Sequence, residues 1–192
     1  YIKAMKEKIA VLETTRTVEG LQDLADAFKR IAEADKPQWQ PYYYAALAQV
    51  NSGYAMMDNP RPDKIDPVAD KAEALLNKAE ALSKNNSEIY AVKSMIATLR
   101  YIVNPMKRAM KYAPLAAQAL ETAKKLNPEN PRVYLLKGRD KFHTPTLFGG
   151  SKAEAKKLFE LSLQKFEFYK PATALDPYWG RGTANHFLSQ IK

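Results

Sequence analysis

Residues Leu115–Gly138 read LAAQALETAKKLNPENPRVYLLKG, and this stretch decides the predicted fold. Ala116 and Leu120 fall on one face of a helix, because residues three and four apart are neighbours on a helical surface. Pro128 ends that helix, and Pro131 can occupy the first turn of the next one, where its missing N–H costs nothing. The stretch therefore predicts the end of one helical hairpin, a tight turn and the start of another.

The same stretch carries residues of fixed size at fixed spacing. A small, a large and a small residue are followed by Pro, an aromatic residue and Gly, at steps of 4, 3, 5, 6 and 4 residues. This pattern resembles the tetratricopeptide (TPR) repeat, a family of stacked helical hairpins.

The glycine of this pattern needs an explanation, because Gly inside a helix costs on the order of 1 kcal/mol relative to Ala. A close helix crossing between Gly138 and Ala116 would explain it, and we expect one there.

The pattern recurs along the chain, which a single hairpin in an unrelated helical protein would not explain. The small, large and small positions fall at Leu24, Phe28 and Ile31, at Ala72, Leu76 and Ala79, at Ala116, Leu120 and Ala123, and at Ala155, Phe159 and Ser162. The aromatic position falls at Tyr42, Tyr90, Tyr134 and Tyr178. We therefore predict an all-α fold, an α-α superhelix of TPR-like hairpins with long loops inside each hairpin.

This superhelix is expected to form a single domain over residues 1–192. The predicted hairpins span about 2–35, 41–84, 88–127 and 131–169, with a terminal helix at 177–191. Thr17, Asp66 and Ser151 are predicted N-caps, because their side chains can accept from the first free backbone N–H groups of a helix. Three long connections are expected within hairpins, on one edge of the stack: 58–66, 104–113 and 143–150.

Charge is uneven along the chain. The formal net charge is +9, and all of the excess lies in residues 107–192, which hold 16 basic and 7 acidic side chains. Such a surface either keeps the protein in solution or attracts acidic partners.

The chain has no Cys, which excludes disulfides and thiolate chemistry. No segment is apolar enough for a transmembrane helix.

The motifs of common enzymes are missing. His143 and His186 are the only histidines, and their spacing matches no metal-binding motif. The glycines at 149–150 and at 180–182 follow no predicted strand, so they do not form a nucleotide-binding loop. We therefore predict that the protein is not an enzyme, with no catalytic residue, no metal site and no cofactor.

The TPR resemblance implies a concave groove lined by the first helix of each hairpin. In that register the groove residues are Tyr43, Leu47, Met95, Thr98, Arg132, Leu135, Arg139, Phe142 and His143. Their mixed apolar and basic character fits an extended peptide with hydrophobic and acidic residues. The Lys and Asn pair with which some TPR proteins hold chaperone C-termini is absent from the matching positions. The predicted function is a non-enzymatic scaffold for a protein or peptide partner.

Two alternatives remain open at this stage. The basic second half could bind nucleic acid or another anionic surface, although its basic residues fall on several helix faces and nucleic acid is the weaker choice. The chain could also be a structural module of a larger assembly.

The TPTLFGGS and PYWG segments resemble exported bacterial TPR proteins, which favours a periplasmic or exported location. The chain begins at Tyr1, with no signal peptide, so we expect an N-terminal segment to have been removed. The partner's identity and the oligomeric state are left open.

Overall fold

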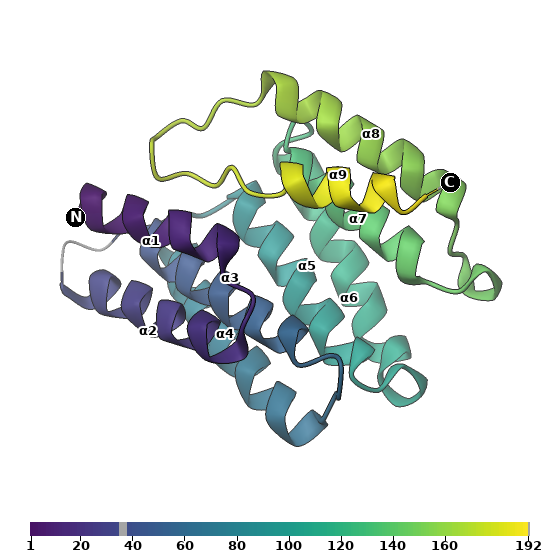
Figure 1. Cartoon of the computed structure of the whole chain (residues 1–192), viewed down its shortest axis with the longest axis horizontal. Coiled ribbons are helices and arrows are strands. Elements are labelled where there is room, and N and C mark those ends of the chain that lie inside the picture. Colours follow the sequence, from purple (N-terminus) through teal and green to yellow (C-terminus); the bar gives the residue numbers. More distant parts are fainter. Residues whose placement is uncertain (35–37, 192) are drawn as a thin grey trace.

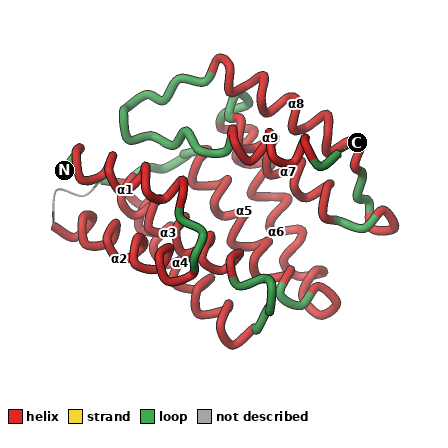
Figure 2. The backbone as a smooth tube through the Cα atoms, in the orientation of Figure 1, coloured by secondary structure: helices red, strands yellow, loops and turns green. Residues whose placement is uncertain are grey.

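The computed structural model describes residues 1–34 and 38–191, and over these residues it contains α-helices, one short 3-10 turn and no β-strand (Figures 1 and 2). The helices are α1 Ile2–Thr14, α2 Val18–Ala34, α3 Trp39–Ala55, α4 Pro62–Leu82, α5 Ser87–Ile102, α6 Pro105–Leu126, α7 Pro131–His143, α8 Lys152–Phe168 and α9 Arg181–Ser189. The all-α prediction is confirmed. The predicted end of the first hairpin at residue 35 lies outside the described residues. Within the described part of the chain, no helix is long and apolar enough to cross a membrane.

The helices pack as a stack of antiparallel neighbours. The most extensive pairings join α3 with α4, α5 with α6 and α7 with α8, and α2 packs mainly on α3 (Figure 1). Helix α1 makes lighter contact with α2 and α3, and α9 rests against α7 and α8. This is the hairpin superhelix that the repeated spacing predicted.

The repeat positions form the buried faces of the even-numbered helices. Ala72, Leu76 and Ala79 of α4 are completely buried, and so are Ala155 and Phe159 of α8. The distance between packed helices depends on the side chains at their contact, so alanines at these positions permit close packing. With the exception of the half-buried Ile31, the spacing therefore identifies buried residues of these four helices.

Side-chain caps begin several helices where the sequence predicted them. Thr17 Oγ1 accepts from the backbone N–H of Gly20 at 3.2 Å, and Ser151 Oγ accepts from that of Glu154 at 3.1 Å. Both predicted caps are confirmed. Each cap satisfies one of the backbone donors that a helix leaves free at its start.

The predicted start of α4 at Asp66 is wrong. The helix begins at Pro62, which occupies the first turn, and Pro67 lies inside the helix. The internal proline removes one backbone hydrogen bond. The buried side chains of Ile65 and Val68 on either side anchor this first part of the helix to the core.

The predicted connection at 104–113 is also wrong. Asn104 caps α6, its Oδ1 accepting from the N–H of Lys107 at 3.4 Å, and the helix starts at Pro105 and continues through Pro114. The Asn-Pro pair that was interpreted as the end of one helix therefore begins the next. A Pro is equally acceptable just after a helix and in the first turn of one. The hairpin ends of α3–α4, α5–α6 and α7–α8 still lie on the same side of the stack (Figure 1).

Gly138 marks a close crossing, but its partner is not Ala116. A Cβ placed on Gly138 would lie 2.6 Å from Cε1 of Phe159 in α8. Phe159 is completely buried, and its ring stacks on that of Phe187 at a centroid distance of 5.1 Å. The ring therefore has little freedom to move away.

We expect Gly138→Ala to destabilise the protein by about 1–3 kcal/mol, because overpacking against Phe159 outweighs the better helix propensity of Ala. The measurement is urea unfolding followed by circular dichroism. Gly182→Ala is the matched control, since nothing lies within 4 Å of a Cβ at Gly182. A Gly138→Ala protein as stable as the control would contradict the crossing.

Candidate functional site

The chain between α8 and α9, residues 169–180, is here called the C-terminal segment. It extends from the end of α8 toward α1 and then returns to α9 (Figure 1). Two polar side chains of α3 hold it. Tyr44 donates its hydroxyl to the carbonyl of Leu175 at 3.1 Å, and Gln40 Nε2 donates to Asp176 Oδ1 at 3.0 Å. The segment is therefore attached to the N-terminal half of the stack.

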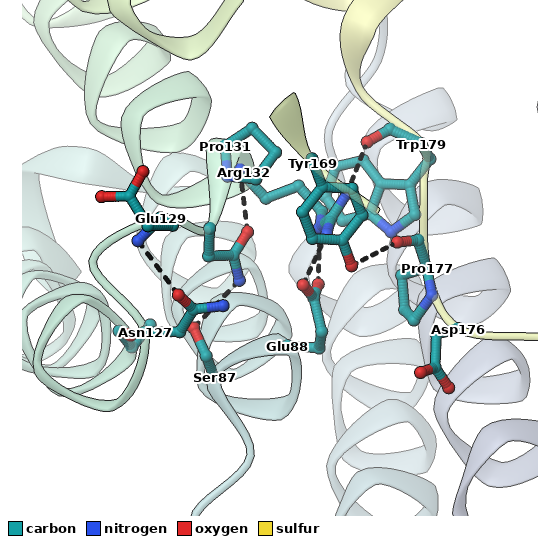
Figure 3. A network of polar contacts seen from close by, with 12 residues as sticks. Ser87, Glu88, Asn127, Glu129, Pro131, Arg132, Tyr169, Asp176, Pro177 and Trp179 are labelled. Carbon is teal, nitrogen blue, oxygen red and sulfur yellow. Dashed lines mark hydrogen bonds and ion pairs between the residues drawn. The ribbon is translucent and has the colours of Figure 1, made fainter. Parts of the chain in front are cut away.

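A buried ion pair fixes the other end of the C-terminal segment. Arg132 donates from Nε and Nη2 to both carboxylate oxygens of Glu88 at 2.5 Å, and from Nη1 to the carbonyl of Trp179 at 3.2 Å (Figure 3). The Tyr169 ring centroid lies 4.6 Å from the guanidinium carbon. Burial alone would lower the pKa of Arg132, but Glu88 raises it above the ordinary value. The guanidinium is thus a permanent cation inside the protein.

Local sequence explains why Arg132 points inward. Asn130 caps α7 by accepting from the N–H of Arg132 at 3.0 Å, and it donates from Nδ2 to Ser87 Oγ at 2.9 Å. Ser87 in turn donates to the carbonyl of Ala123 at 2.8 Å. The start of α7 is therefore joined to the start of α5 and the end of α6. This places Arg132 beside Glu88.

A cavity of about 800 Å³ lies between the C-terminal segment and the N-terminal helices. This volume is in the range of sites that hold small molecules and cofactors. The lining comes from α1, the α1–α2 turn, α2, α3, α5, α7, α8, the C-terminal segment and α9: Ile9, Leu12, Glu13, Thr15, Arg16, Leu21, Tyr44, Leu47, Asn51, Tyr54, Ala55, Met95, Arg139, Phe166, Tyr169, Pro171, Tyr178, Trp179, Gly180, Arg181, Gly182 and Thr183.

Two arginines line this cavity without a carboxylate partner among the described residues. Arg16 comes from the α1–α2 turn and donates only to the carbonyl of Thr15 at 2.8 Å. Arg139 comes from α7, and its guanidinium carbon lies 5.1 Å from the ring centroid of Tyr54. Both guanidinium groups can therefore receive carboxylates from a ligand.

The phenols of the lining remain neutral. Burial raises the pKa of Tyr54, whose hydroxyl donates to the carbonyl of Met95 at 3.0 Å. Burial, and then the charge of Glu13, also raises the pKa of Tyr178. Neither histidine lines the cavity, and the described residues contain no group of three or more side chains suited to a metal ion. The cavity thus offers aromatic faces, neutral hydroxyls and cationic guanidinium groups.

Three of the predicted groove residues line the cavity, namely Leu47, Met95 and Arg139. The repeat spacing placed them on the inner faces of α3, α5 and α7. Thr98 is half-buried beside the Tyr54 hydroxyl. The structure thus brings together groove residues from three successive hairpins.

The other predicted groove residues are covered by the chain itself. Tyr43 is completely buried and accepts from Trp179 Nε1 at 2.9 Å, and Arg132 lies under the same segment. Leu135 is buried against α8 and α9, whereas Phe142 and His143 contact the ring of Phe187 in α9. The C-terminal segment and α9 thus cover much of the surface that the sequence predicted as an open groove.

The sequence analysis missed the residues that complete the cavity. Arg16 lies in a turn outside the repeat pattern. Trp179 belongs to the PYWG segment, which the sequence analysis placed in a terminal helix at 177–191 and compared with exported TPR proteins. The start of that helix was predicted wrongly, because α9 begins only at Arg181. The concentration of aromatic residues around Trp179 in a polar loop was the available signal, because such residues are enriched where one side is buried.

We expect Arg132→Met to lower the free energy of unfolding by about 3–5 kcal/mol, because Glu88 would be left as an uncompensated buried charge. The double variant Arg132→Met with Glu88→Leu should recover much of this loss. Urea unfolding of the two variants and the wild type measures both effects. Equal stability of the single variant and the wild type would show that the pair is not the anchor of the segment.

Comparison with known proteins identifies a relative. No protein-family profile and no curated protein sequence match this chain. Among solved structures, the HusA haemophore from Porphyromonas gingivalis superposes with a TM-score of 0.87 and 32% sequence identity, covering 100% of this chain and 92% of HusA. HusA is named as a haemophore, which is a binding protein rather than an enzyme, and the present chain belongs to the same family as HusA.

Proposed function

We propose that the cavity binds a haem-like tetrapyrrole. The observation that carries the proposal is the cavity of about 800 Å³, with aromatic walls and two arginines that lack carboxylate partners within the described chain. The relationship to HusA, named as a haemophore, supports it. This role is non-enzymatic, as the sequence predicted.

The chemistry of the lining suits such a ligand. A tetrapyrrole is a flat, largely apolar ring that carries carboxylate side chains. Aromatic residues such as Tyr54 and Trp179 offer faces for stacking, and Leu47 and Met95 offer apolar contact. The carboxylates would pair with guanidinium groups, where charge-assisted bonds are roughly twice as strong as neutral ones.

The same lining suggests how the ring is held. No histidine lines the cavity, and burial raises the pKa of Tyr54 and Tyr178, which disfavours the phenolate form that binds haem iron. In this proposal, stacking and carboxylate pairing therefore supply the binding energy. Iron-free protoporphyrin should then bind with an affinity close to that of haem.

We expect Arg139→Glu to weaken haem binding by roughly tenfold or more, since a hydrogen bond to a charged group is worth about 1.5–3 kcal/mol. The measurement is titration with haem, followed by Soret absorbance and by quenching of tryptophan fluorescence, because Trp179 lines the cavity. Arg30→Glu is the control, because this substitution makes the same change of charge. Arg30 is exposed on α2 and does not line the cavity.

Two results of this haem titration would contradict the proposal. A wild-type protein with no Soret change and no quenching would refute the proposal. Equal weakening by Arg139→Glu and Arg30→Glu would place the ligand outside this cavity.

Peptide binding in a TPR-like groove is the second candidate. Leu47, Met95 and Arg139 favour it, because they were predicted from the TPR register and line one cavity. In this alternative the C-terminal segment leaves only part of the groove for an extended peptide. A peptide that competes with haem for the purified protein would support a shared site.

A further inference from the structure

Among the described residues, five large apolar side chains are at least 75% exposed, and four of them belong to two hairpin ends. Met106 and Met110 are 94% and 96% exposed, and Leu147 and Phe148 are 87% and 75% exposed. The fifth, Phe168 at 84%, lies at the far end of α8. Exposed apolar residues are common singly, but such a concentration indicates a contact surface.

The two hairpin ends are neighbours in the stack. Met106 and Met110 lie in the first turns of α6, and Leu147 and Phe148 lie in the turn between α7 and α8. Figure 1 shows the α5–α6 and α7–α8 ends on the same side of the molecule. Neither pair lines the cavity, so this surface is independent of the proposed haem site.

The start of α6 combines these methionines with positive charge. Residues 105–113, PMKRAMKYA, hold three basic side chains and no acidic one. Arg108 pairs with Asp66 at 2.7 Å. Lys107 and Lys111 are exposed and form no ion pair with a carboxylate in the described chain. Met106 and Met110, one helical turn apart, share a face beside these lysines.

The α7–α8 turn holds its apolar side chains in a fixed position. Lys141 Nζ donates to the carbonyl of Gly149 at 3.0 Å, and the N–H of Ser151 donates to the carbonyl of Lys141 at 2.9 Å. Exposed Lys152 and Lys156 follow in the first turns of α8, with Glu154 between them, which pairs with Lys141 at 2.8 Å. An ordered turn therefore presents Leu147 and Phe148 a few residues before a helix start with a net positive charge.

We propose that these two hairpin ends dock the protein on an anionic lipid surface. Apolar side chains next to lysines are the combination that binds the interface of negatively charged membranes. The side chains project from the start of α6 and from the α7–α8 turn, and they line neither the large cavity nor the smaller one beside the α3–α4 connection. Projecting residues can enter a soft lipid interface, whereas a protein partner would need a pocket of its own for each.

The test uses the whole protein and vesicles of phosphatidylcholine, with or without phosphatidylglycerol. The variant replaces all four side chains: Met106→Ser, Met110→Ser, Leu147→Ser and Phe148→Ser. We expect the wild type to sediment with anionic vesicles and the variant to partition at least about tenfold less, because four apolar groups are lost from the interface. Phe168→Ser is the matched control and should bind as the wild type does. Circular dichroism checks that each protein is folded.

A second variant tests the charge. Lys107→Glu with Lys111→Glu should also reduce binding to anionic vesicles, and added salt should weaken binding by the wild type. Failure of the wild type to bind anionic vesicles would overturn the proposal. So would equal binding by the wild type and the four-residue variant. Concentration-dependent dimerisation that only the four-residue variant loses, without vesicle binding, would overturn it in favour of a second copy of this chain.

Discussion

The ion pair between Arg132 and Glu88 connects three parts of the chain that are far apart in the sequence. It joins α7 to α5, and through the carbonyl of Trp179 it also holds the C-terminal segment. A charged pair of this kind adds little stability relative to a well-packed apolar pair, but each partner depends on the other. Its position therefore specifies how two hairpins and a long loop are arranged, and the cavity follows from that arrangement.

The cavity combines a repetitive wall with a non-repetitive one. Helices α3, α5 and α7 contribute Leu47, Met95 and Arg139 from equivalent inner faces, as in a stack of similar units. The C-terminal segment contributes Tyr178 and Trp179 from the opposite side. A stack alone offers an open surface for extended partners. The C-terminal segment adds a second wall, so part of that surface becomes a cavity.

The sequence was sufficient to predict the helical hairpins and three of the residues that line the cavity, namely Leu47, Met95 and Arg139. Helical periodicity and the recurring small residues depend on near neighbours, so they predicted the hairpins and their buried faces. The groove residues of α3, α5 and α7 came from the resemblance to TPR repeats. The start of α6 was missed because Asn104-Pro105 is compatible with either a helix end or a helix start. The partner of Gly138 and the role of Trp179 were missed because they depend on contacts between distant segments, which local spacing does not encode.

The attachment of the C-terminal segment also has a kinetic consequence. Its hydrogen bonds to α3 join residues 131 to 136 positions apart, whereas the contacts within each hairpin are local. Contacts between distant residues form late in folding because they must close a long loop. Local opening of a segment generally costs less free energy than global unfolding. Such partial opening would let a ligand enter and leave while the hairpins remain folded, so the rate of exchange would be set by the attachment rather than by the stack.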